Sequence, residues 1–171
     1  MRRDAETIPN ASPDEARRLR AVYLKLKSAL YDQLTGLYSY HVHLDHLESQ
    51  ARGRRLGIIV LEFPTLAALE AAYGWEASDR FVAGVASHLG ALKGRDLPGS
   101  ALITLDGVYG NTFPVFVWEG PAGEDVTSPY LAEAGARLSS LLETRLRTAP
   151  WAPEPAPVDF SVGHALVRAN P

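Results

Sequence analysis

The sequence predicts a mixed α/β (α+β) fold, a sheet covered by helices, and three observations support this class. The segment LGIIVLEF (56–63) is a continuous apolar run rich in β-branched residues, which is typical of a strand buried on both faces. Two more apolar runs, ALITL (101–105) and FPVFVW (113–118), are joined by the turn-rich link DGVYGNT, which predicts a hairpin. Between and after these strands, apolar residues recur every three or four positions, as on the buried side of a helix.

The first element is a lead helix. Ser12 can cap its first turn, Pro13 suits the first helical position, and Glu15 completes a capping box. Apolar residues then follow at intervals of three and four, forming a narrow seam of Leu19, Val22, Leu26 and Ala29. Such a seam can join two helices, but it lasts for under two heptads, so the helix either dimerises or packs on its own domain. We assign residues 1–31 to a tail and this lead helix, and 32–171 to one following domain.

The remaining elements follow from the same patterns. Helices are expected over 39–50, 65–73, 78–92 and 130–146, and a last strand over 158–167 after the proline-rich loop PWAPEPAP. From residue 56 onward the order is strand, helix, helix, strand, strand, helix, strand. A buried first strand, a central hairpin and a crossover helix together make a mixed sheet covered by helices.

Composition excludes several classes of function. The chain has 171 residues, 46% hydrophobic and 22% charged, which fits one globular domain. Its net charge of −3 argues against a nucleic-acid partner, and no apolar run approaches the roughly 20 residues of a membrane span. Without cysteine there is no disulfide or thiolate metal site, and His43 and His46 alone do not complete a metal site. We expect a cytoplasmic protein without metal or cofactor.

A family resemblance rests on four segments. DQLTGL resembles the D-x-L-T-G-L signature that opens GGDEF domains, which have the diguanylate cyclase fold; its residues are Asp32, Leu34, Thr35, Gly36 and Leu37. The stretch from LGIIVLEF to VASHL is similar to the family's first strand and the two helices after it. VYGNTFPVFV stands in the place of R-Y-G-G-D-E-F-A-V, and FSVGHAL resembles the late S-I-G-V-A strand. Over residues 30–167 the resemblance implies a nucleotide-cyclase or palm-like sheet of order βααββαβ, coupled by the glycine turn to the lead helix.

The resemblance also implies which residues would be catalytic. Diguanylate cyclases join two GTP molecules into cyclic di-GMP on two metal ions held by carboxylates. Here the first metal-binding aspartate aligns with Glu62, the second with Pro64, and the hairpin Asp-Glu pair with Asn111 and Thr112. Tyr109 stands where a glycine would let backbone amides approach phosphate. The whole signature loop reads Tyr109, Gly110, Asn111, Thr112 and Phe113. We therefore predict a degenerate domain with no catalytic residue and no cyclase activity.

Nucleotide binding is also expected to be lost. The guanine-binding positions of the family align with Glu70 and Asp79. Asp79 could accept from guanine N1–H and N2–H, but a second carboxylate would repel the first and would meet the acceptor O6. The product-inhibition motif R-x-x-D is absent, because Arg95 and Asp96 are adjacent. We expect neither GTP nor cyclic di-GMP to bind.

The prediction is a catalytically inactive signalling or scaffold module that contacts another protein or a second copy. Family domains continue into a last helix and strand, whereas this sequence ends at Pro171, so we expect an open sheet edge that favours such contact. Two alternatives remain. The chain could sense GTP without turnover within cyclic di-GMP signalling, or it could be a generic α/β partner-binding domain that carries LTGL by coincidence.

Overall fold

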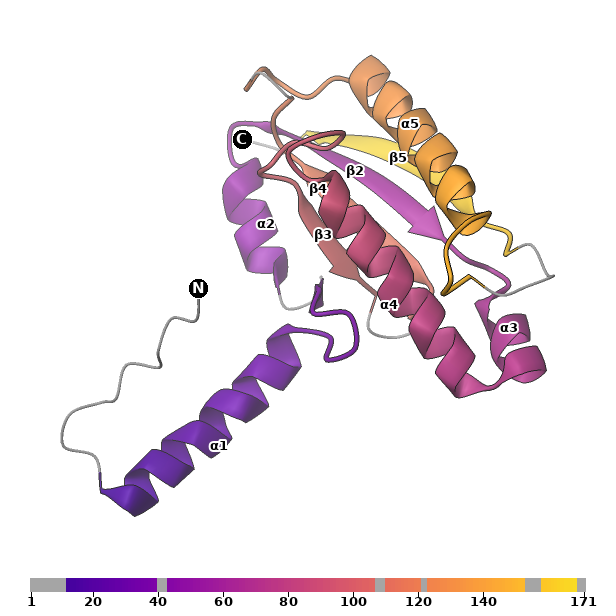
Figure 1. Ribbon diagram of the computed structural model, residues 1–171. Coiled ribbons are helices and arrows are strands. Elements are labelled where there is room, and N and C mark those ends of the chain that lie inside the picture. Colours follow the sequence, from indigo (N-terminus) through magenta and orange to yellow (C-terminus); the bar gives the residue numbers. More distant parts are fainter. Residues whose placement is uncertain (1–11, 40–42, 107–109, 121–122, 153–157, 169–171) are drawn as a thin grey trace.

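The structure is a computed structural model that describes residues 12–39, 43–106, 110–120, 123–152 and 158–168. The helices are α1 (Pro13–Leu30), α2 (Leu44–Ala51), α3 (Leu66–Tyr73), α4 (Trp75–Leu92) and α5 (Ser128–Leu146). The strands are β1 (Tyr38–Ser39), β2 (Arg55–Glu62), β3 (Leu102–Leu105), β4 (Thr112–Val117) and β5 (Ser161–Arg168). From β2 onward the order βααββαβ is confirmed (Figure 1).

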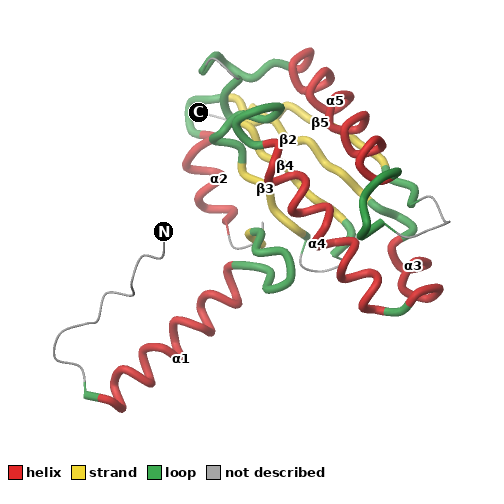
Figure 2. Tube along the Cα trace, in the orientation of Figure 1, coloured by secondary structure: helices red, strands yellow, loops and turns green. Residues whose placement is uncertain are grey.

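The strands form one mixed sheet in the order β1-β3-β4-β2-β5. β2 pairs antiparallel with β4 on one side and with β5 on the other, and β1 pairs in parallel with β3. The predicted hairpin is confirmed, because β3 and β4 are antiparallel neighbours. Figure 2 shows α4 and α5 running alongside the strands, and α2 at the opposite end of the sheet from α3.

The main core lies between the sheet and helices α4 and α5. Ile59 and Leu61 of β2 are fully buried there, and the ring of Phe63 meets those of Phe81 and Phe113 edge-on, at centroid distances of 5.2 and 5.8 Å. The alternate side chains of β2 face the other way, where Leu56 forms a second cluster with Leu47 of α2. These two clusters hold the sheet between its helices.

The prediction that segment 56–63 is buried on both faces was wrong for part of its length. Ile58 and Val60 are only half-buried, while Ile59 between them is completely buried. Side chains alternate along a strand, so each face is covered only where another element packs on it. Val60 is paired with Gly163 of β5, which is itself exposed, so this part of the sheet face is not fully covered.

Some predicted boundaries also needed correction. Ser39, expected in a helix, pairs in β1; positions 40–42 lie outside the described residues, and α2 begins only at Leu44. α4 begins at Trp75, because Gly74 alone, at φ 83°, makes the turn after α3. Trp75, the first residue of α4, is 65% exposed. α5 begins two residues early, at Ser128, behind a Thr127 cap.

The capping box of α1 is confirmed. The Ser12 N–H donates to Glu15 Oε2 (2.9 Å), and the Glu15 N–H donates to Ser12 Oγ (3.3 Å). α1 extends away from the sheet (Figure 1). Leu19 and Val22 are 50% and 55% exposed, so these two seam residues do not pack on the chain's own domain. The side chains of Leu26 and Ala29 lie outside what the structure describes. In the described part of the chain, no helix has the length and apolar character that crossing a bilayer requires.

Candidate functional site

The opening motif 32–37 is a turn that closes on itself. Asp32 Oδ1 accepts from both the Thr35 N–H and the Thr35 hydroxyl, each at 2.7 Å. The Gly36 N–H donates to Asp32 O (2.8 Å), and Gly36 adopts φ 69°, a left-handed conformation that glycine tolerates. The Leu37 N–H then donates to Thr35 Oγ1 (3.2 Å). The aspartate, threonine and glycine of the motif therefore each have a local structural role.

This turn fixes the end of α1 to the edge of the sheet. The Asp32 N–H donates to Leu37 O (2.8 Å), which brings Tyr31 beside Tyr38. The Tyr31 hydroxyl donates to the Tyr38 hydroxyl (3.0 Å), and the two rings lie 4.4 Å apart. Tyr38 in turn pairs with Thr104 of β3. The turn and the two tyrosines thus link the end of α1 to β1, and through β1 to β3.

The signature loop lies where β2 ends and β4 begins. Glu62 and Thr112 are register partners, and the Phe63 N–H donates to Asn111 O (2.9 Å). The Thr112 hydroxyl donates to Asn111 Oδ1 (3.1 Å). Gly110 has φ 66°, and Phe113 is fully buried in the core, so the two signature residues on either side of this pair are structural. Tyr109 lies outside the described residues.

The side chains gathered here do not fit two metal ions. Glu62 is an exposed carboxylate, Pro64 offers no ligand, and Asn111 and Thr112 supply only neutral oxygens that bond each other. Sequence reasoning missed Asp106, whose N–H donates to Thr112 O (2.9 Å) and which therefore flanks Thr112 on the β3 side. Asp106 and Thr112 are the first and last residues of the predicted hairpin link DGVYGNT, and this could have indicated that they lie close together. Among the described residues, no three His, Cys, Asp or Glu side chains gather as a metal site.

The two guanine-aligned residues lie on neighbouring helices. Glu70 is exposed near the end of α3, and Asp79 is half-buried in the first turns of α4, with the Gly74 turn between them. Within the described part of the chain, neither side chain has a hydrogen bond or ion pair. Both residues therefore lie at the same corner of the fold, where α3 meets α4, but their side chains do not interact with each other.

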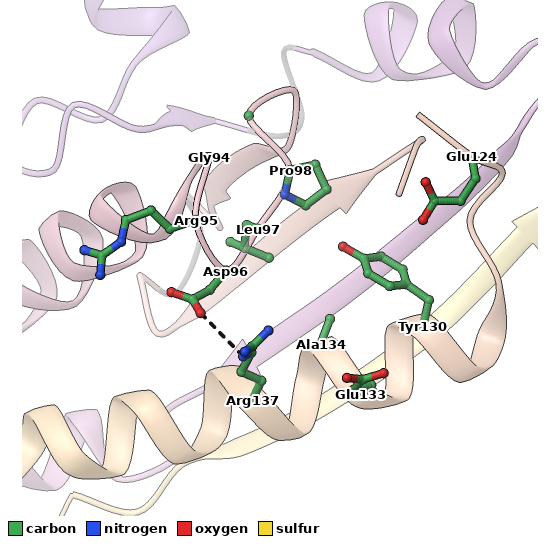
Figure 3. A pocket seen from close by; sticks show the side chains of 11 residues that line it. Gly94, Arg95, Asp96, Leu97, Pro98, Glu124, Tyr130, Glu133, Ala134 and Arg137 are labelled. Carbon is green, nitrogen blue, oxygen red and sulfur yellow. Dashed lines mark ion pairs between the residues drawn. The ribbon is translucent and has the colours of Figure 1, made fainter. Parts of the chain in front are cut away.

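A pocket that sequence reasoning did not predict lies between the 94–99 loop and α5 (Figure 3). Its volume is about 340 Å³. Its lining comprises Gly94, Arg95, Asp96, Leu97, Pro98, Gly99, Glu124, Tyr130, Glu133, Ala134 and Arg137.

Two charged groups of this pocket pair with each other, while the Tyr130 hydroxyl is buried without a hydrogen-bond partner among the described residues. Arg137 Nε lies 3.4 Å from Asp96 Oδ1, whereas Arg95 extends away from Tyr130 (Figure 3). Burial raises the pKa of Tyr130, and the charges of Glu124 and Glu133 add to that effect. Arg95 and Asp96, which stand in place of the R-x-x-D motif, therefore point to different surroundings.

No protein-family model matches the chain, and no curated protein matches it in sequence. Solved structures do. The coiled coil and GGDEF domain of DgcB from Caulobacter crescentus, in complex with c-di-GMP, matches with a TM-score of 0.65 at 18% identity, over 91% of this chain and 79% of that one. The chain has the GGDEF fold.

Two further solved structures with this fold are longer chains, of which only a part matches. Diguanylate cyclase SiaD from Pseudomonas aeruginosa, in complex with its activator SiaC, matches with a TM-score of 0.62 at 20% identity over 91% of this chain. Vibrio cholerae LapD, an S helix-GGDEF-EAL structure bound to c-di-GMP, matches with a TM-score of 0.61 at 15% identity over 88% of this chain. The chain spans 56% of SiaD and 32% of LapD. The three matches cover 88% to 91% of this chain, so the likeness in fold is not limited to the segment around the LTGL motif.

Proposed function

We propose that this chain is a catalytically inactive GGDEF-fold module that acts in cyclic di-GMP signalling through protein–protein contact, including contact with a second copy. Its structural neighbours supply the context: DgcB and LapD were solved with c-di-GMP, and SiaD with its activator protein SiaC. The chain shares their fold while its signature loop differs from the family's in composition.

The side chains at the end of β2 and the start of β4 are the main support for the proposal, because they supply few charged oxygen ligands. Two divalent ions and a triphosphate need several converging carboxylates, because each dication is neutralised by charged oxygen ligands. At the end of β2, Glu62 is paired with the neutral Thr112, whose hydroxyl donates to Asn111 Oδ1. Two residues after Glu62, Pro64 offers no ligand. Asp106 adds one carboxylate beyond Thr112. This donor set is too small for phosphoryl transfer between two nucleotides.

The position of α1 supports self-association. It leaves the domain at the opening turn and exposes Leu19 and Val22. Burying an apolar side chain of this size contributes roughly 1.5 to 3 kcal/mol before association entropy is subtracted. A few such side chains on each copy therefore suffice for a weak dimer, and the Asp32–Thr35 turn would pass its arrangement on to the sheet edge.

The GTP-sensing alternative has less support. Guanine recognition would need Glu70 and Asp79 to act together, but Glu70 is exposed and its carboxylate offers no donor for O6. No basic partner for the phosphates lies at Pro64 or in the Asn111–Thr112 pair. We therefore assign the chain no nucleotide ligand.

Incubation of the purified chain with GTP and Mg²⁺ or Mn²⁺ tests the inactive state. We expect no cyclic di-GMP above a protein-free blank, with an active diguanylate cyclase as the positive control. Restoring acids with the double substitution Asn111→Asp and Thr112→Glu should not create activity, because Pro64 and Tyr109 remain. Protein-dependent product from the unmodified chain would refute the proposal.

A further inference from the structure

The segment 66–80, here named the α3–α4 corner, exposes an apolar helix face. Leu66 and Leu69 of α3 are buried, whereas the opposite side of that helix presents exposed alanines at positions 67, 68, 71 and 72. Two aromatic side chains beside it are also exposed: Tyr73, on the same side of α3 as Leu69, by 44%, and Trp75, at the start of α4, by 65%. Exposed apolar surface that includes Trp and Tyr is typical of a site that another molecule covers.

The corner carries negative charge. Glu70 and Glu76 are exposed and Asp79 is half-buried, against the single basic residue Arg80. Three acidic residues and one basic residue give the segment a net charge of −2. A molecule that covers this surface should therefore combine apolar side chains with positive charge.

α1 has that composition. It exposes Leu19, Val22 and Tyr23, the last of them by 61%, together with the arginines at positions 17, 18 and 20. Its residues 13–30 include five basic and two acidic side chains, a net charge of +3. Of the seven large hydrophobic side chains exposed in the described part of the chain, five lie on α1 or the corner.

We propose that α1 of one copy docks on the α3–α4 corner of a second copy. This inference rests on the proposed self-association and names the surface that receives α1. If two α1 helices paired side by side, two segments of net charge +3 would repel each other. The α3–α4 corner, with a net charge of −2, would attract α1 instead. Within its own chain, α1 is fixed to β1 by the opening turn and extends away from the sheet (Figure 1).

The contacts expected in this complex have a physical basis. The exposed rings of Trp75 and Tyr73 would attract the α1 arginines, because guanidinium groups are attracted to aromatic faces. The exposed alanines present no long side chain that would hold a helix at a distance. α1 has 18 residues and is therefore about 27 Å long, enough to extend over the corner.

Sedimentation of the 171-residue chain and three variants tests the proposal. We expect the unmodified chain to associate, and both Val22→Asp, which disrupts α1, and Trp75→Ala, which disrupts the corner, to weaken association at least tenfold. Val167→Ala is the matched control, because Val167 is 42% exposed on β5, away from both surfaces, and its loss should change the dissociation constant less than twofold. Circular dichroism should show that all variants keep their secondary structure.

A mixing experiment separates the two possible contacts of α1. A 1:1 mixture of the Val22→Asp and Trp75→Ala variants retains one intact α1 and one intact corner, so it should associate more strongly than either variant alone. Raising NaCl from 50 to 300 mM should weaken association of the unmodified chain several-fold, because the charges attract.

The outcomes distinguish this inference from the proposed function. If Trp75→Ala associates as the unmodified chain does, while Val22→Asp does not, α1 pairs with another α1 and the corner is not its site. Association that strengthens with salt would also overturn the inference. If the unmodified chain stays monomeric at several hundred micromolar, the self-association within the proposed function fails as well.

Discussion

Gly84 allows Trp151 to pack against α4, and replacing it with alanine should destabilise the fold. Gly84 is buried in the middle of α4, and a Cβ added there would overlap the indole of Trp151, at 2.5 Å from Cγ and 2.6 Å from Cε2. The indole also meets Phe81 edge-on, at a centroid distance of 5.8 Å. The overlapping atoms belong to a rigid ring, so Trp151 would have to leave its place.

Two opposing terms set the size of the effect. Replacing glycine with alanine inside a helix gains about 1 kcal/mol from backbone entropy. Forcing extra volume into a packed site costs about 1 to 3 kcal/mol, and a rigid ring at this distance favours the upper part of that range. Gly84→Ala should therefore lower the free energy of unfolding by about 1 to 2 kcal/mol.

Gly90 provides the matched control on the same helix. It is exposed, and a Cβ there would meet no atom within 4 Å, so Gly90→Ala should raise the free energy of unfolding by about 0.5 to 1 kcal/mol. Urea unfolding followed by far-ultraviolet circular dichroism measures both variants. If Gly84→Ala stabilised the chain as much as Gly90→Ala does, the packing of Trp151 on α4 would be refuted.

Three more predictions concern ligand, assembly and pH. Calorimetric titration with GTP, with and without magnesium, should show a dissociation constant weaker than about 1 mM; a micromolar affinity abolished by Asp79→Ala would restore the sensor function. A chain starting at Ser28, which lacks most of α1, should sediment as a monomer at concentrations where the full chain associates; monomers in both cases would contradict an assembly role for α1. Burial lowers the pKa of His88 below its ordinary 6.5, with a smaller contribution from Arg145. The unfolded chain then takes up a proton at His88 more readily than the folded one, so stability should fall as pH drops below 6.5. His88→Gln should reduce that slope more than His164→Gln at an exposed strand position does, and equal slopes in the two variants would count against the burial of His88.

The sequence by itself determined the features that arise from local interactions. The Ser12–Glu15 capping box and the Asp32–Thr35 turn link residues three positions apart, so the residue types predict the bonds. The order of strands and helices from β2 onward followed from apolar periodicity, which reports each segment's own geometry. That positions 111 and 112 hold neutral asparagine and threonine side chains is likewise a matter of residue identity.

Only the tertiary structure decided what each surface faces. Val60 was expected to be buried, yet it is half-buried, because burial depends on elements that are distant in the sequence. For the same reason the sequence does not show that Trp75 is exposed. The same cause hid the approach of Asp106 to Thr112 across the hairpin and the pocket between the 94–99 loop and α5. Periodicity gives the direction of a side chain relative to its own helix or strand, but the partner on that side is set by how the whole chain packs.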